Sequence, residues 1–80
     1  MSDTVFDVRG FFCPLPVLKA ARALRAMSPG ERLRVLVSDR ASVAEFRAFC
    51  RESGHALVAF TEEDGTYVFV IRRGEGSAGL

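Results

Sequence analysis

The last third of this 80-residue chain consists of two apolar stretches separated by the dipeptide Asp64-Gly65. A two-residue hairpin loop of the primed type needs positive φ angles, and Asp-Gly adopts them readily. Residues 55–62 and 66–73 are therefore predicted to form two antiparallel strands, which makes the fold at least partly β.

Hydrophobic periodicity predicts a strand, a helix, a strand and a second helix ahead of this hairpin. Residues 4–8 are rich in Val and Phe and favour a short strand. Residues 14–27 carry apolar side chains at helical spacing, and Ser28-Pro29-Gly30 ends that helix. Residues 31–38 alternate between apolar and polar side chains, as expected of a strand with one buried face.

The second helix is predicted to begin with a capping box. In Ser42-Val43-Ala44-Glu45, the hydroxyl at the N-cap and the carboxylate at N3 would each bind a free backbone amide. Gly54 suits the left-handed position that follows such a helix. Cys50 lies on the apolar stripe of the helix and is expected in the core.

The order βαβαββ predicts an α+β fold, a two-layer α/β sandwich in which two helices cover one face of a four-stranded mixed sheet. The other face of the sheet would stay open. Because the last strand is apolar on both sides, that open face is a candidate partner surface. We expect a single domain over residues 1–73 and a disordered C-terminal tail over residues 74–80, which are rich in Gly and Ser.

Composition and charge exclude several classes of function. Eleven Lys and Arg against ten Asp and Glu leave a net charge of +1, which argues against a strongly basic nucleic-acid-binding protein. No apolar run approaches the ~20 residues of a membrane span, and the first residues lack the features of a signal peptide. The expected location is the cytoplasm. A core this small leaves little room for a deep cavity, so chemistry is expected at the surface.

The two cysteines and the one histidine limit the possible chemistry. Cys13 and Cys50 are too few for a zinc site unless His55 and a carboxylate join them, so we expect no metal and no cofactor. A structural disulfide is disfavoured in a reducing cytosol. A cysteine hydrolase would need His55 within reach of Cys13, and nothing in the sequence indicates that. A Cys-x-x-Cys redox pair is excluded because residue 16 is Pro.

The segment Cys13-Pro14-Leu15-Pro16 is the most unusual in the chain. Both prolines fit the first turn of a helix, where their missing amides lose no helical hydrogen bond. That register places Cys13 at the N-cap, with the amide of Leu15 as the nearest free donor. The amide and the helix dipole both favour a thiolate, so the pKa of Cys13 is expected below its ordinary value.

The charges near this segment support the same expectation. Residues 8–30 contain no Asp or Glu, whereas they contain four cations. Arg9 either steers an anionic sulfur or is a solvated loop charge. Lys19, Arg22 and Arg25 form either a solvated helix face or a docking patch for an acidic partner or tRNA. An exposed thiol of low pKa without a resolving partner is suited to hold sulfur as a persulfide and pass it on by thiol exchange.

Several motifs over about residues 6–73 occur together in one known family. They are Asp7-Val8-Arg9-Gly10, Cys13-Pro14-Leu15-Pro16-Val17, Gly30-Glu31-Arg32-Leu33, Ser38-Asp39, Phe49-Cys50, Gly54-His55-Ala56-Leu57 and Phe69-Val70-Ile71-Arg72. In these motifs the chain resembles the TusA/SirA sulfur-carrier proteins. The resemblance implies a two-layer sandwich and a persulfide on Cys13. The residues that would support that sulfur are Arg9, Gly10, Pro14, Leu15 and Pro16.

The resemblance also implies partner proteins. The donor would be a cysteine desulfurase or a rhodanese-like protein. The acceptor would serve tRNA thiolation, sulfur oxidation or molybdenum cofactor biosynthesis, and some relatives concern selenium. The chain would then be a sulfurtransferase-like carrier rather than a stand-alone enzyme. It departs from the family pattern at Phe12, at Asp39-Arg40 and at Glu45-Phe46, where other residues are common.

Two other interpretations remain open. A non-catalytic adaptor or regulatory binding module would dock through the basic helix or the open sheet face, with Cys13 serving only as a helix cap. Cys13→Ser would then keep activity, because Ser is a good N-cap residue. Direct RNA contact through the helix cations is disfavoured by the net charge and by the lack of an aromatic-basic motif.

Overall fold

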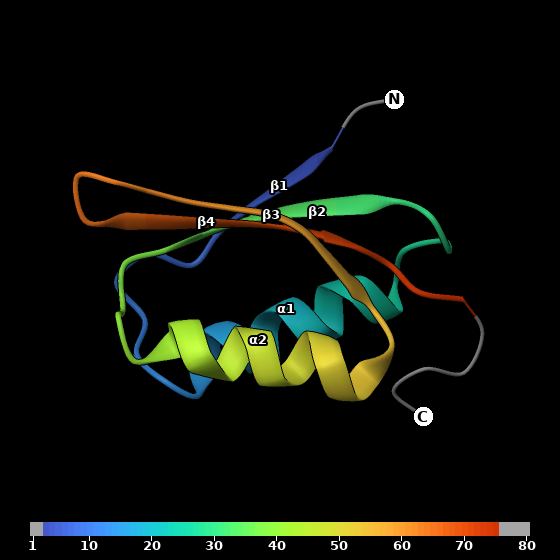
Figure 1. Cartoon of the computed structure of the whole chain (residues 1–80), viewed down its shortest axis with the longest axis horizontal. Helices are drawn as coiled ribbons and strands as arrows, with labels where there is room; N and C mark the ends of the chain where they lie inside the picture. The colour runs from blue at the N-terminus through green and yellow to red at the C-terminus, as the bar shows by residue number, and fades with distance from the viewer. Residues whose placement is uncertain (1–2, 76–80) are drawn as a thin grey trace.

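Two helices pack against one face of a four-stranded sheet in the computed structural model, which describes residues 3–75 (Figure 1). The elements in chain order are β1 (Thr4–Asp7), α1 (Leu15–Arg25), β2 (Arg32–Val37), α2 (Ser42–Ser53), β3 (Ala56–Glu63) and β4 (Thr66–Arg72). The predicted α+β class and βαβαββ order are confirmed.

The sheet is mixed, with the strand order β1-β2-β4-β3. β1 runs parallel to β2, whereas β4 is antiparallel to both β2 and β3. The turn between β3 and β4 has φ angles of 52° at Asp64 and 81° at Gly65, so the predicted hairpin turn is confirmed. Since β1 and β2 are parallel neighbours, the segments that follow them leave the sheet at the same edge.

The core lies between the sheet and the helices. The alternation in β2 buries Leu33, Val35 and Val37 completely, as the sequence predicts. The rings of Phe46 on α2 and Phe69 on β4 stack with centroids 4.7 Å apart. The other buried apolar residues of this core are Val8, Ala20, Leu24, Cys50 and Ile71.

Helix α1 is shorter than the predicted span of residues 14–27. It begins at Leu15, with Pro14 in the N-cap position, and no side chain caps it. The amide of Leu15 donates to the carbonyl of Phe12 at 2.9 Å, so this turn precedes the helix. At the other end, the amides of Ala26 and Met27 donate to carbonyls three residues back, which tightens and ends the helix.

The predicted capping box at the start of α2 is wrong. The N-cap is Ala41, and Ser42 is the first helical residue, completely buried. Its hydroxyl donates to Asp39 Oδ2 at 3.0 Å instead of accepting a helix amide. The carboxylate three residues upstream is a stronger acceptor than a hydroxyl is, and it binds the Ser42 hydroxyl and the amide of Ala41, while no side chain caps a helix amide. Gly54 follows α2 in the left-handed conformation, as predicted.

The face of the sheet opposite the helices is not covered by any element of residues 3–75 (Figure 1). Val5 lies on it opposite Arg34 and is 60% exposed. The C-terminal tail is expected over residues 74–80. The amide of Gly74 donates to His55 Nδ1 at 2.8 Å, and residues 76–80 lie outside the described part of the chain. Within residues 3–75, no helix has the length and apolar character that crossing a bilayer requires.

Candidate functional site

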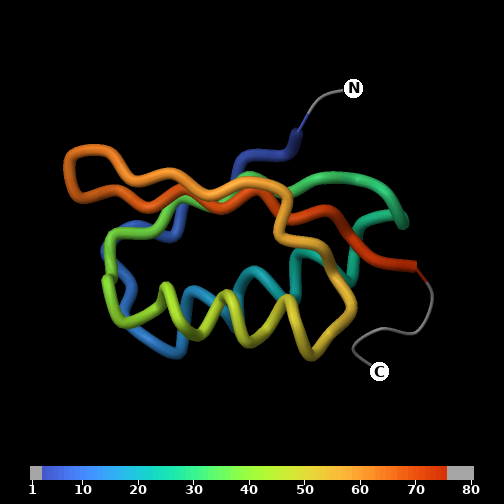
Figure 2. The backbone as a smooth tube through the Cα atoms, viewed as in Figure 1, coloured from blue at the N-terminus to red at the C-terminus, as the bar shows by residue number. Residues whose placement is uncertain are grey.

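Cys13 lies exposed in the loop between β1 and α1. Figure 2 shows this loop in blue beside the green segment that joins β2 to α2. The two segments are hydrogen bonded, because the amide of Cys13 donates to Asp39 Oδ2 at 2.6 Å. The segment between β2 and α2 therefore holds the first loop in place through the carboxylate of Asp39.

The carboxylate of Asp39 accepts two hydrogen bonds in addition to that of Cys13. The hydroxyl of Ser42 donates to Oδ2 and the amide of Ala41 donates to Oδ1, at 3.0 and 3.3 Å. The hydrogen bond from Cys13, with those from Ser42 and Ala41, holds the pKa of Asp39 below its usual range. The sequence alone predicts no site role for Asp39. The signal for its wider role is that Asp39 follows β2 at the edge where the parallel strand β1 also ends.

Gly10 forms a second hydrogen bond between the same two segments. Its amide donates to the hydroxyl of Ser38 at 2.8 Å, and its φ is +91°. That angle is strained for any residue with a Cβ atom, which explains glycine at this position. Just before it, the amide of Val8 donates to the carbonyl of Leu36 at 2.9 Å and extends the pairing of β1 with β2.

Arg9 is engaged by its own neighbour rather than by the thiol. Its Nε and Nη2 donate to the two carboxylate oxygens of Asp7 at 2.9 and 2.8 Å. This bidentate pair lowers the pKa of Asp7 to about 2. Of the two interpretations of Arg9, the structure favours a loop charge that braces the end of β1.

The prolines occupy different helix positions from those predicted. Pro14 is the N-cap and Pro16 is the second residue of α1, where it is completely buried. The peptide bond between Cys13 and Pro14 is cis. Because Pro14 holds the N-cap position, Cys13 lies outside the helix, and the suggestion that it serves only as a helix cap is wrong. Leu15 is 45% exposed, and its amide is already used by the carbonyl of Phe12.

The expectation of a lowered pKa for Cys13 is also wrong. Partial desolvation of the thiol, together with the negative charges of Glu45 and Asp39, raises the pKa of Cys13 above its ordinary value. The absence of acidic residues from positions 8–30 does not matter, because the fold brings the start of α2 to the thiol. The amide that would have favoured the thiolate is bonded elsewhere.

Cys50 is the other free cysteine, and it is buried in the core on α2, as predicted. Burial raises the pKa of its thiol to about 11. A protonated, buried thiol is a poor nucleophile, so Cys13 is the accessible sulfur of this chain.

The three cations of α1 lie on the same helix that follows Cys13. Arg22 and Arg25 are exposed, and Lys19 is half-buried with its Nζ 4.7 Å from the ring centre of Phe11. Within residues 3–75, none of the three forms an ion pair. They form a basic strip leading away from the thiol.

His55 lies far from Cys13. Cys13 is bound at the start of α2, whereas His55 follows the end of that 12-residue helix, about 18 Å away along its axis. The ring packs against Phe49, and Nδ1 accepts the amide hydrogen bond of Gly74. A Cys–His hydrolase pair is therefore excluded. Over the described residues 3–75, no three His, Cys, Asp or Glu side chains are grouped to hold a metal ion.

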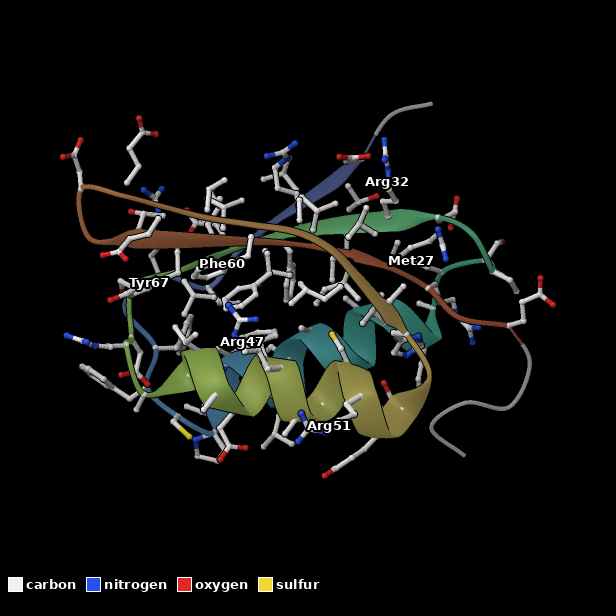
Figure 3. The ribbon with its side chains drawn as sticks, in the orientation of Figure 1. Met27, Arg32, Arg47, Arg51, Phe60 and Tyr67 are labelled. Atoms are coloured by element: carbon white, nitrogen blue, oxygen red, sulfur yellow. The ribbon has the colours of Figure 1, made fainter. Side chains whose placement is uncertain are left out.

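Two shallow hollows flank α2, and neither includes Cys13. One, of about 440 Å³, lies between α2 and the β3–β4 hairpin. Figure 3 shows Arg47 reaching from the helix toward Phe60, and its guanidinium carbon lies 5.0 Å from the ring centre. The other, of about 340 Å³, is lined by Arg51, Cys50 and His55 among others.

Comparison with known proteins identifies the family. The family model for sulfurtransferase TusA matches residues 4–73, which is nearly the whole chain. The chain belongs to the TusA family. The sulfur-carrier function expected from the sequence agrees with this membership, and such a carrier implies both a sulfur donor and a sulfur acceptor protein.

Individual relatives agree with the family assignment. A Neisseria meningitidis relative is 42% identical over 72 residues, covering 90% of this chain and 97% of the relative. The sulfur carrier protein TusA of Allochromatium vinosum is 41% identical over 71 residues, covering 89% and 93% of the two chains. A solved SirA-like protein from Desulfitobacterium hafniense superposes with a TM-score of 0.79 at 28% identity, covering 90% of this chain and 99% of that one.

Proposed function

We propose that this chain carries sulfur as a persulfide on Cys13 and passes it to an acceptor protein. The observation that carries the proposal is the contrast between its two cysteines: Cys13 is exposed on a braced loop, and Cys50 is buried with a pKa of about 11. In a family of sulfur carriers, the accessible thiol is the one that a donor can reach.

The loading step needs no oxidant, reductant or metal. The thiolate of Cys13 attacks the outer sulfur of a donor persulfide, a new S–S bond forms at Cys13, and the S–S bond of the donor breaks. The donor leaves as a thiolate and takes up the proton that Cys13 gave up. Delivery repeats the step, with an acceptor thiol attacking the outer sulfur on Cys13.

The residues around Cys13 would hold it rather than react. Asp39 fixes the backbone of Cys13, and Gly10 ties the loop to Ser38. Pro14 and Pro16 stiffen the start of α1. The proposed donor is a cysteine desulfurase or a rhodanese-like protein, which docks near Lys19, Arg22 and Arg25. The proposed location is the cytoplasm, where both thiols stay reduced.

The experiment is to incubate the protein with a cysteine desulfurase, pyridoxal phosphate and cysteine, and to measure its intact mass. The wild type and Cys50→Ala should gain the mass of one sulfur atom, and Cys13→Ser should gain none. Circular dichroism of Cys13→Ser checks that the fold is intact. Loading that survives in Cys13→Ser but disappears in Cys50→Ala would overturn the proposal.

The adaptor is the second candidate, supported by the unpaired cations of α1 and the open face of the sheet. For an adaptor, a folded Cys13→Ser variant would keep its biological activity in complementation of a strain lacking this protein. For a sulfur carrier, the same variant would be inactive.

A further inference from the structure

Large apolar side chains exposed to solvent gather around Cys13. Six large hydrophobic residues of the described chain are exposed, and four of them lie within residues 11–18. These four, which we call the apolar patch, are Phe11 at 40%, Phe12 at 72%, Leu15 at 45% and Leu18 at 58% exposure. The other two, Val5 and Val58, lie on the edge strands of the sheet.

The patch is held in a fixed arrangement next to the thiol. Phe12 directly precedes Cys13, and its carbonyl accepts the amide hydrogen bond of Leu15 at 2.9 Å. Leu18 lies three residues after Leu15 and shares its face of α1. Side chains on a helix lean toward its N-terminus, so Leu18 leans toward the end of α1 where Cys13 lies. Phe11 is covered on one side by Lys19.

The fold does not require these side chains to be apolar. The inward face of α1 consists of Pro16, Ala20 and Leu24, which are completely buried. The patch residues lie on the outward side or in the loop and add little to the core. A small soluble domain exposes several large apolar side chains together mainly where another molecule binds.

The charges beside the patch indicate the character of that molecule. α1 has no acidic residue, and Arg22 and Arg25 continue its outward face with no ion pair inside residues 3–75. A complementary surface is apolar opposite the patch and carries carboxylates opposite the two arginines. A protein can present both, whereas a small thiol cannot.

We propose that the apolar patch is the surface by which the sulfur-donating protein recognises this chain. The donor presents apolar residues around its own persulfide and carboxylates facing Arg22 and Arg25. The inference rests on the proposed function, because it takes Cys13 as the point where sulfur arrives. Sulfur exchange brings two sulfur atoms into contact, so any donor that reaches Cys13 must cover its neighbours. Phe12, the most exposed of them, is the main anchor.

The first arm of the test measures loading rates from a cysteine desulfurase as a function of carrier concentration. The double variant Phe12→Ser/Leu18→Ser should raise KM about 10-fold or more with kcat nearly unchanged, because the lost contacts bind the carrier without taking part in the exchange. The matched control Val5→Ser/Val58→Ser removes two exposed apolar side chains elsewhere, and its KM should stay within about 2-fold of the wild type.

The second arm loads the same proteins with glutathione persulfide, a small donor that needs no docking surface. Wild type and the Phe12→Ser/Leu18→Ser variant should load at equal rates. The inference is overturned if the variant matches the wild type with the desulfurase, or if it is slowed equally with both donors. A wild-type protein whose Cys13 takes up sulfur from neither donor would instead refute the proposed function.

Discussion

The thiol of Cys13 shares its surroundings with the carboxylates of Asp39 and Glu45. Desolvation and these two charges keep its pKa above the ordinary value, so at neutral pH the thiol is largely protonated. A protonated thiol is a weak nucleophile and resists oxidation. The reactivity of the free carrier is therefore set by Asp39 and Glu45, before and within the first turn of α2, and not only by the loop that holds the cysteine.

Replacing Glu45 by Gln tests this electrostatic control. Removal of one negative charge should lower the pKa of Cys13 and raise its alkylation rate at pH 7, by about 2-fold or more. The measurement is the rate of reaction with iodoacetamide from pH 6 to pH 10. Glu52→Gln, on the same helix but not among the groups that shift Cys13, is the control and should react like the wild type. An unchanged or slower reaction of Glu45→Gln would show that the carboxylate has no influence.

Gly10 offers a second test at the level of one residue. Its φ of +91° is costly for alanine, whereas a Cβ atom added there meets nothing within 4 Å. Gly10→Ala should therefore lower the free energy of unfolding by ~1 kcal/mol, entirely through backbone conformation. Urea denaturation measures this change. A loss of several kcal/mol would mean that the loop is crowded, and no loss would mean that the loop adopts another conformation.

The starts of the two helices show how accurately local sequence rules predict helix boundaries. The prolines predict the beginning of α1 to within one residue, as is usual for helix boundaries. That one residue matters here, because it moves Cys13 out of the N-cap position. The amide of Leu15, expected to bind the sulfur, is bonded to Phe12. The error is small in structure, but it removes the amide that was expected to lower the pKa of Cys13, while desolvation and the charges of Glu45 and Asp39 raise that pKa.

At the start of α2, a substitution of Ser42 tests the hydrogen bond between its hydroxyl and Asp39. Its hydroxyl is buried and donates to Asp39, so Ser42→Ala should cost ~1 kcal/mol of stability. It should also speed hydrogen exchange of the Cys13 amide, because Asp39 loses one of the groups that orient it. Thermal unfolding and amide exchange measure the two effects. A variant with unchanged exchange at Cys13 would show that the carboxylate is oriented without Ser42.

For the molecule as a whole, the sequence predicts the layers but not the contact that builds the site. Periodicity and the Asp64-Gly65 turn are local signals, and they lead correctly to two helices on one face of a mixed sheet. The hydrogen bonds from Gly10 to Ser38 and from Cys13 to Asp39 join residues 28 and 26 positions apart. They depend on the parallel pairing of β1 with β2, which no local pattern specifies.

The protonation of His55 makes the stability of the protein depend on pH. Burial and the charge of Arg73 lower its pKa below the ordinary value of 6.5. In the neutral ring, Nδ1 accepts the amide hydrogen bond of Gly74 at 2.8 Å. Its contribution to stability is present above pH 6.5 and is lost as the pH falls below that value, because the unfolded chain takes up the proton first. Asp7 and Asp39, with lowered pKa values, lose their contributions only near and below their ordinary value of 3.8.

The melting temperature should therefore fall between pH 7 and pH 5, and the His55→Gln variant should show a flatter dependence over the same range. Calorimetry at a series of pH values measures both proteins. A wild-type melting temperature that is constant over this range, or an equally steep fall in His55→Gln, would contradict the role of His55.

We propose that sulfur is held on Cys13 and nowhere else in the molecule. The most direct measurement is to load the wild-type protein with a desulfurase and cysteine, alkylate it, digest it with trypsin and find the added sulfur by mass spectrometry. The two cysteines fall in different peptides, residues 10–19 and 48–51. We expect the extra sulfur on the peptide of Cys13 alone. Sulfur on the peptide of Cys50, or on neither, would contradict it.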